Sequence, residues 1–235
     1  MKILAVESSA GPASCAVYED GKVLASSYIN VKLKHSQTLI PMIDAMLKNS
    51  GIGIDDIDML AVAAGPGSFT GVRIGVAAIK GIAFARGIPC IGVSTLAAMA
   101  HMAGALHFDG IVCPAMDARC SQVYTAMFEC SSNTLTRLTE DSALKIEELK
   151  NQIINTKKSV LFVGDGALLC YNAICPNCAN VYIAPEQFRF QNAVGVAMQA
   201  ASQPEKAVSA DSLLPIYLRL PQAERELKRK TGAKA

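Results

Sequence analysis

The sequence predicts an α/β protein of two lobes, each built from one β-β-β-α-β-α unit. Two observations support this: strand-like segments alternate with helix-like segments, and the two halves of the chain repeat them in the same order. Of the 235 residues, 51% are hydrophobic and 18% are charged, which excludes disordered and fibrous classes. The apolar stretches are short or interrupted by glycine and lysine, below the roughly 20 residues that a membrane helix needs, so we expect no membrane segment.

The first half predicts four strands and two helices. The strands are expected at residues 3–6, 14–18, 23–29 and 59–64. Between the second and third strands, Glu19-Asp20-Gly21 is a hairpin signal. One helix is predicted over 38–49, with Pro41 tolerated in its first turn, and a second helix over 71–85 after a glycine-rich turn.

The second half repeats this plan, and its first strand ends at Asp117, 110 positions after Glu7. Its strands are expected at 111–116, 122–128, 135–138 and 160–163, with helices at 146–154 and 192–202. Near-constant offsets between corresponding elements indicate duplication. The predicted division is an N-terminal partner-binding lobe at 1–105, a C-terminal lobe at 106–221 and a basic, flexible tail at 222–235.

The distribution of charge limits the binding partners that we expect, and the N-terminal residues indicate the cellular location. Residues 219–235 hold six Lys or Arg and two Glu, which leaves 16 basic against 18 acidic residues elsewhere. That balance excludes nucleic-acid binding along the whole length, while the tail itself is either a solvated helix end or an RNA contact. The apolar run before Glu7 is only four positions long, too short for a signal peptide, so we expect a cytoplasmic protein.

The eight cysteines, without a secretion signal, are expected to be reduced thiols. Cys170, Cys175 and Cys178 form a cluster with a C-P-N-C step. A structural zinc site normally uses four ligands, and neither a second cysteine pair nor a nearby histidine is present in the sequence. The cluster is therefore a cysteine-containing loop or, as the alternative, a metal or redox site.

The segment from Gly65 to Gly75 follows an apolar strand and leads into a helix. It matches neither the dinucleotide motif nor a P-loop. One interpretation is a phosphate contact at the helix N-terminus, and the other is a tight strand-to-helix turn. The candidate phosphate-contacting residues are Gly65, Gly67, Ser68, Thr70 and Gly71.

The two helices of the first half also suggest a surface for another protein. Apolar residues cover an arc of roughly 160° on the first helix, wider than the ~100° that one core face requires. The second helix is rich in small residues, which allow another backbone to approach closely. The predicted contacts are Leu39, Ile43, Met46, Leu47, Gly75, Ala78 and Ile82. The alternative is a helix that is buried on all sides within its lobe.

Several motifs together resemble the TsaB (YeaZ) family. They span most of residues 1–130 and also the segment near the end of the chain. The matching segments are 3–9, 35–43, 65–75, 81–83, 87–89, 92–96, 117–119 with 123–124, and 215–219. The long glycine motif with its flanks is the most specific of them.

The resemblance implies a fold of the actin/hexokinase/Hsp70 type. It also implies a role in making N6-threonylcarbamoyladenosine beside the anticodon of tRNA. In that family the protein is a non-catalytic partner of its paralogue TsaD, which transfers the threonylcarbamoyl group, and a small ATPase, TsaE, joins the pair. We therefore expect a homodimer when the chain is alone, only indirect contact with tRNA and no required cofactor, with a nucleotide at the complex left open.

Departures from the catalytic paralogue support this assignment. Gly11-Pro12 stands where the paralogue has an acidic pair, and Thr95 and Met99 stand where it has two metal-binding histidines. Glu7 replaces the aspartate usual in the TsaB family. The competing prediction is an ATP-dependent phosphoryl or carbamoyl transferase that uses Glu7 and Asp117 around Mg²⁺ and the glycine-rich segment for phosphate.

Overall fold

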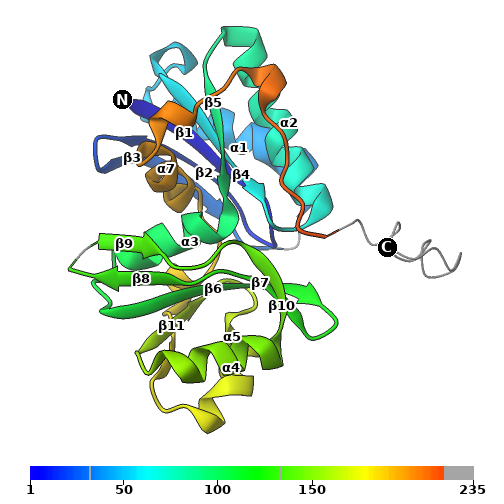
Figure 1. Cartoon of the computed structure of the whole chain (residues 1–235). Coiled ribbons are helices and arrows are strands. Elements are labelled where there is room, and N and C mark those ends of the chain that lie inside the picture. Colours follow the sequence, from blue (N-terminus) through cyan, green and yellow to red (C-terminus); the bar gives the residue numbers. More distant parts are fainter. Residues whose placement is uncertain (32, 133, 220–235) are drawn as a thin grey trace, which may run out of the picture.

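The computed structural model describes residues 1–31, 33–132 and 134–219. The predicted basic tail lies outside these residues. Two β-sheets lie one above the other, with helices on their outer faces and between them (Figure 1). No helix among the described residues is both long and apolar enough to cross a bilayer.

The first sheet has the strand order β3-β2-β1-β4-β5. Its strands are β1 (Lys2–Glu7), β2 (Ala13–Glu19), β3 (Lys22–Ile29), β4 (Met59–Gly65) and β5 (Cys90–Ser94). The pairs β1–β2 and β2–β3 are antiparallel hairpins, and β1–β4 and β4–β5 are parallel. Parallel neighbours need a crossover, which α1 and α2 provide on the outer face.

The second sheet has the corresponding order β10-β7-β6-β11-β12 with the same strand directions. Its strands are β6 (Gly110–Arg119), β7 (Gln122–Thr125), β10 (Ser142–Lys145), β11 (Val160–Val163) and β12 (Val181–Ile183). Because strand order and strand direction both repeat, the predicted duplication of the β-β-β-α-β-α unit is confirmed.

One predicted strand was placed wrongly in this plan. The segment 135–138 falls in β9 (Thr134–Arg137), which forms a hairpin with β8 (Phe128–Ser131), and β10 takes the third position instead. The reason is the length of β6. Its first part pairs with β8 and its later part with β7, so one strand serves two partners along the same edge.

The helices fall into two groups. On the outer faces lie α1 (His35–Ser50), α2 (Phe69–Arg86), α4 (Ile146–Thr156) and α5 (Ala167–Ile174), whereas α3 (Thr95–Gly104) and α7 (Ala193–Ala201) lie between the sheets. The short α6 (Glu186–Arg189) and four 3₁₀ turns complete the fold: Ile54–Asp56, Cys175–Asn177, Pro204–Lys206 and Ala210–Ser212. Because α1 begins at His35, Pro41 lies inside the helix rather than in its first turn, on the exposed side.

The predicted boundary of the C-terminal lobe needs correction. The small side chains of α7 pack against the inner face of the first sheet, beside Ile3 and Ala5. α7 also crosses α3 closely, because a Cβ on Gly195 would lie 2.2 Å from the carbonyl oxygen of Ala98. Residues from 193 onward therefore return to the first lobe, although the sequence pattern assigned them to the second.

Residues 207–219, the terminal strap, then run along the first lobe toward the junction (orange to red in Figure 1). Val208 pairs with Cys90 through two backbone hydrogen bonds of 2.9 and 2.7 Å. The Lys80 ammonium donates to two strap carbonyls, at 3.2 and 3.1 Å. The amide of Ile216 donates to the carbonyl of Ala64 at 2.7 Å, so the strap is fixed along its length.

Candidate functional sites

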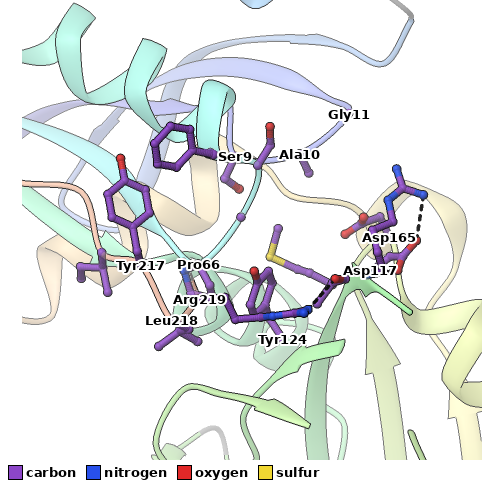
Figure 2. A pocket seen from close by; sticks show the side chains of 17 residues that line it. Ser9, Ala10, Gly11, Pro66, Asp117, Tyr124, Asp165, Tyr217, Leu218 and Arg219 are labelled. Carbon is purple, nitrogen blue, oxygen red and sulfur yellow. Dashed lines mark hydrogen bonds and ion pairs between the residues drawn. The ribbon is translucent and has the colours of Figure 1, made fainter. Parts of the chain in front are cut away.

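A cleft of about 460 Å³ lies where the two lobes meet the terminal strap. Figure 2 shows its walls: Ser9, Ala10 and Gly11 of the β1–β2 turn; Asp117, Tyr124 and Asp165 of the second lobe; and Tyr217, Leu218 and Arg219 of the strap. With Pro66 of the glycine-rich turn, residues from five separate parts of the sequence thus meet at one place, which is the general position of ligand sites between domains.

Glu7 lies at the end of β1, two residues before Ser9 of the cleft wall, with only 1% of its surface exposed. Its Oε1 accepts a 2.5 Å hydrogen bond from the amide of Ser9, whereas Oε2 has no protein partner. Burial raises the pKa of this carboxyl group to about 7, the charge of Asp165 adds to the rise, and the hydrogen bonds from Ser9 oppose it. The buried carboxyl group therefore favours its neutral form.

The two acids of the second lobe are held by their own chain. Asp117 accepts a 2.7 Å hydrogen bond from the amide of Arg119 and forms an ion pair of 3.3 Å with its guanidinium. Asp165 accepts a 2.7 Å hydrogen bond from the side-chain amide of Gln191. Both carboxylates therefore help to shape loops at the cleft, in addition to lining it.

The predicted phosphate loop is packed against other backbone. A Cβ on Gly67 would lie 2.5 Å from the carbonyl oxygen of Ser9, and one on Gly71 would lie 2.1 Å from that of Ser8. Gly65 has φ +126°, and a Cβ on it would lie 2.2 Å from the carbonyl oxygen of Ile216 in the strap. These close approaches within the chain account for all three glycines without a ligand.

Some backbone amides of the same loop already donate hydrogen bonds within the chain. The amide of Ser68 donates to the carbonyl of Ser9 at 2.7 Å, and the Ser68 hydroxyl caps α2 by accepting from the amide of Gly71 at 3.3 Å. Ser68 and Gly67 line the cleft, whereas Thr70 is exposed on the helix. Contact between this loop and a phosphate stays a prediction, and the geometry does not form an open cradle for one.

At the mouth of the cleft, α2 and the strap are joined by an aromatic and guanidinium stack. The Arg73 guanidinium lies 3.8 Å from the ring centroid of Phe69, and its Nε donates to the Tyr217 hydroxyl at 2.8 Å. The rings of Phe69 and Tyr217 lie 5.0 Å apart. Arg219 then donates to the carbonyl of Ala118 at 2.8 Å and so joins the strap to the second lobe.

The second candidate site is the outer side of the first lobe, and here several predicted contacts were wrong. Leu39, Ile43 and Met46 are at most 6% exposed and belong to the core under α1 and α2, so they cannot contact a partner. Gly75 is buried too, because a Cβ there would lie 2.5 Å from the Ser8 hydroxyl. The wide apolar arc thus combines a buried row, formed by Leu39, Met42, Ile43 and Met46, with apolar residues such as Ile40 that reach the surface.

Other residues of the two helices do reach the surface. Leu47, Ala78 and Ile82 are half-buried, so their contact with a partner stays a prediction, while Ile40 is 50% and Phe84 80% exposed. Gly81 faces open space, with no atom within 4 Å of a Cβ built on it. We call this surface the α1–α2 face: Ile40, Leu47, Ile74, Ala78, Gly81, Ile82 and Phe84.

Sequence reasoning missed Gly81 and Phe84 as surface residues. Their helical positions carry the signal, because neither lies in the buried row of α2 that contains Val72, Val76 and Ile79. The strap contacts of Arg73 had no comparable signal, since its partner is 144 positions away.

The structure also shows the surroundings of the two positions that correspond to the paralogue's metal-binding histidines. Thr95 and Met99 are buried on α3, and the Thr95 hydroxyl has no protein partner. His101 hydrogen-bonds to Gln199 of α7, and burial lowers its pKa. Within the described ranges, no group of three or more His, Cys, Asp or Glu side chains could hold a metal ion.

Comparisons with known proteins agree with this architecture. The family model described as TsaD, tRNA N6-adenosine threonylcarbamoyltransferase, matches residues 22–226. The tRNA threonylcarbamoyladenosine biosynthesis protein TsaB of Bacillus subtilis is 30% identical, covering 95% of this chain and 96% of the relative. A Pseudomonas aeruginosa crystal structure described as similar to peptidase YEAZ aligns with a TM-score of 0.80 at 28% identity, covering 93% and 99% of the two chains.

A more distant structure, component A of the (R)-2-hydroxyglutaryl-CoA dehydratase of Acidaminococcus fermentans, shares the fold with a TM-score of 0.53 at 13% identity, covering 88% of this chain and 100% of the other. With the duplicated sheets, these likenesses confirm the predicted actin/hexokinase/Hsp70-like fold. The near-complete match to a TsaB relative at 30% identity shows that this chain belongs to the TsaB family.

Proposed function

We propose that this chain acts in the synthesis of N6-threonylcarbamoyladenosine in tRNA, as a non-catalytic subunit that supports the threonylcarbamoyltransferase. The observation that carries the proposal is the match to a TsaB biosynthesis protein over 95% of the chain. The match of the TsaD family model to residues 22–226 supports an origin shared with the transferase, which is the expected partner.

The cleft supports a non-catalytic role. Asp117 and Asp165 are engaged by Arg119 and Gln191, and the glycine-rich loop is packed on the β1–β2 turn. A thioether and a threonine hydroxyl are poor substitutes for imidazoles at a metal site, so Met99 and Thr95 do not rebuild one. The chemistry would then reside on the paralogue.

The α1–α2 face is the surface that we propose for the paralogue. Its seven residues carry no charge, and the open space around Gly81 would allow a facing helix to approach closely. Two chains descended from one ancestor can pair about a pseudo-two-fold axis through equivalent surfaces, so the chain alone would form a homodimer through the same face. A TsaE-like ATPase would join the pair, and tRNA would contact this chain only indirectly.

The substitution Gly81→Glu tests this surface. Because open space surrounds Gly81, the variant should fold, and its helix should gain propensity relative to glycine. The buried charge would oppose both homodimerisation and co-purification with the transferase paralogue, and tRNA from cells that carry only this variant should lose threonylcarbamoyladenosine on nucleoside analysis.

Leu169→Glu is the matched control, since Leu169 is an apolar residue of α5 that is also exposed, at 44%, but lies on the second lobe. It should leave pairing and tRNA modification unchanged. Normal pairing of the Gly81→Glu chain would remove the α1–α2 face from the proposal. Normal threonylcarbamoyladenosine after deletion of the gene would remove the role in tRNA.

The enzyme alternative rests on one observation: Oε2 of Glu7 has no protein partner, and Ser9, two residues later, lines a cleft large enough for a small molecule. Calorimetry of the isolated chain with ATP and Mg²⁺ separates the two proposals. Tight binding with turnover would favour an ATP-dependent transferase, and we expect neither.

A further inference from the structure

Cys175 and Cys178 occupy a single tight turn. The turn is the 3₁₀ helix Cys175–Asn177 that follows α5, and it is closed by a 3.2 Å hydrogen bond from the amide of Cys178 to the carbonyl of Cys175. Such a bond between residues i and i+3 defines a β-turn-like segment with Cα atoms less than about 7 Å apart. Natural disulfides join Cα atoms about 4.4–6.8 Å apart, so the backbone already brings the two residues within bridging range.

The environments of the two sulfurs also differ from those of most other cysteines. Both side chains are half-buried, whereas Cys15, Cys90, Cys113, Cys130 and Cys170 are buried. Cys175 hydrogen-bonds to the Tyr171 hydroxyl, one turn earlier in α5, and Cys178 packs at the edge of the second lobe's core. Reagents in solvent can therefore reach both thiols while the turn keeps them together.

We propose that Cys175 and Cys178 are a redox-modified pair that forms a reversible intramolecular disulfide with hydrogen peroxide. One thiolate attacks a peroxide oxygen, the O–O bond breaks, and a sulfenic acid and one water result after proton uptake. The second thiolate attacks the sulfenic sulfur, the S–S bond forms as the S–O bond breaks, and a second water leaves. Two thiols are oxidised, one peroxide is reduced to two waters, and a dithiol reductant reverses the change.

The test uses the full chain treated with peroxide and then unfolded. Eight thiols are present before treatment, and we expect the titratable number to fall by two, with a mass decrease of about 2 Da. Peptide mapping should place the bridge between Cys175 and Cys178, and dithiothreitol should restore the thiols.

The exposed Cys120 provides the matched control. Cys120→Ser should keep the bridge, whereas Cys175→Ser and Cys178→Ser should each abolish it. Unchanged thiols, a bridge that includes Cys120, or oxygen added to either half-buried cysteine without a cross-link would each overturn the proposal. Peptide mapping of the chain without substitutions is by itself enough to test the bridge. The test therefore does not depend on whether the Cys→Ser variants fold.

Discussion

Replacing Glu7 by glutamine should change how the stability of this protein depends on pH. The carboxyl group is 1% exposed, Oε2 has no partner, and burial raises its pKa from 4.5 to about 7. Between these two values the folded chain binds more protons at this site than the unfolded chain does. Stability contributed by the neutral form is therefore complete below about pH 4.5 and is lost as pH rises through about 7.

The size of the effect follows from that interval. At about 1.4 kcal/mol for each pKa unit, the free energy of unfolding should fall by about 3 kcal/mol between the two pKa values because of Glu7 alone. The lowered pKa of His101 acts in the opposite direction, since the unfolded chain binds more protons there. His101 is present in both proteins, so comparing them isolates Glu7.

Urea unfolding followed by circular dichroism, at a series of pH values from about 5 to about 8, measures the difference. Glu7→Gln keeps an oxygen for the Ser9 amide and carries no charge. It should be about as stable as the parent at the acidic end and about 3 kcal/mol more stable at the alkaline end. Parallel stability curves for the two proteins would refute the assignment of Glu7 as a buried acid with a raised pKa.

Four further substitutions probe the rest of the structure. Gly71→Ala places a Cβ 2.1 Å from the Ser8 carbonyl and should cost about 1–3 kcal/mol in urea unfolding, whereas Gly81→Ala, in open space, should add up to about 1 kcal/mol. Equal effects would contradict the packing role of Gly71. Leu39→Ala should cost about 2–5 kcal/mol, a loss that a surface contact residue would not show. Tyr217→Phe removes only the hydrogen bond to Arg73 and should lower the free energy of unfolding by about 1 kcal/mol, measured by thermal unfolding. A larger loss would contradict the assignment of this single hydrogen bond to the Tyr217 hydroxyl.

The sequence was a good guide wherever a local pattern decides the structure. Alternating and continuous apolar runs predicted β1, β4 and β6, and helical spacing predicted α1 and α2 to within a few residues. The third strand of the second lobe was missed because Ser142-Ala-Leu-Lys has no apolar run, and its position depends on pairing with β7. Long-range pairing overrides weak local preference in such strands.

The functional residues show the same limit. Apolar spacing on α1 could not distinguish a wide core face from a contact surface, and so Leu39, Ile43 and Met46 were assigned to the wrong one. The glycine-rich segment was recognisable, but Gly67 and Gly71 face Ser9 and Ser8, more than fifty positions earlier in the chain. No motif encodes which distant backbone will require that space.

The return of the last residues to the first lobe affects the order in which the protein can fold during synthesis. β1 to β5 emerge first, yet the inner face of their sheet stays uncovered until α7 emerges, and Leu213 of the terminal strap completes the opposite core. Domains usually fold as units as they leave the ribosome. Here the core of the lobe that is translated first is completed by residues that are translated last, so a chain shortened before residue 193 would leave Ile3, Ala5 and their neighbours less covered and prone to aggregation.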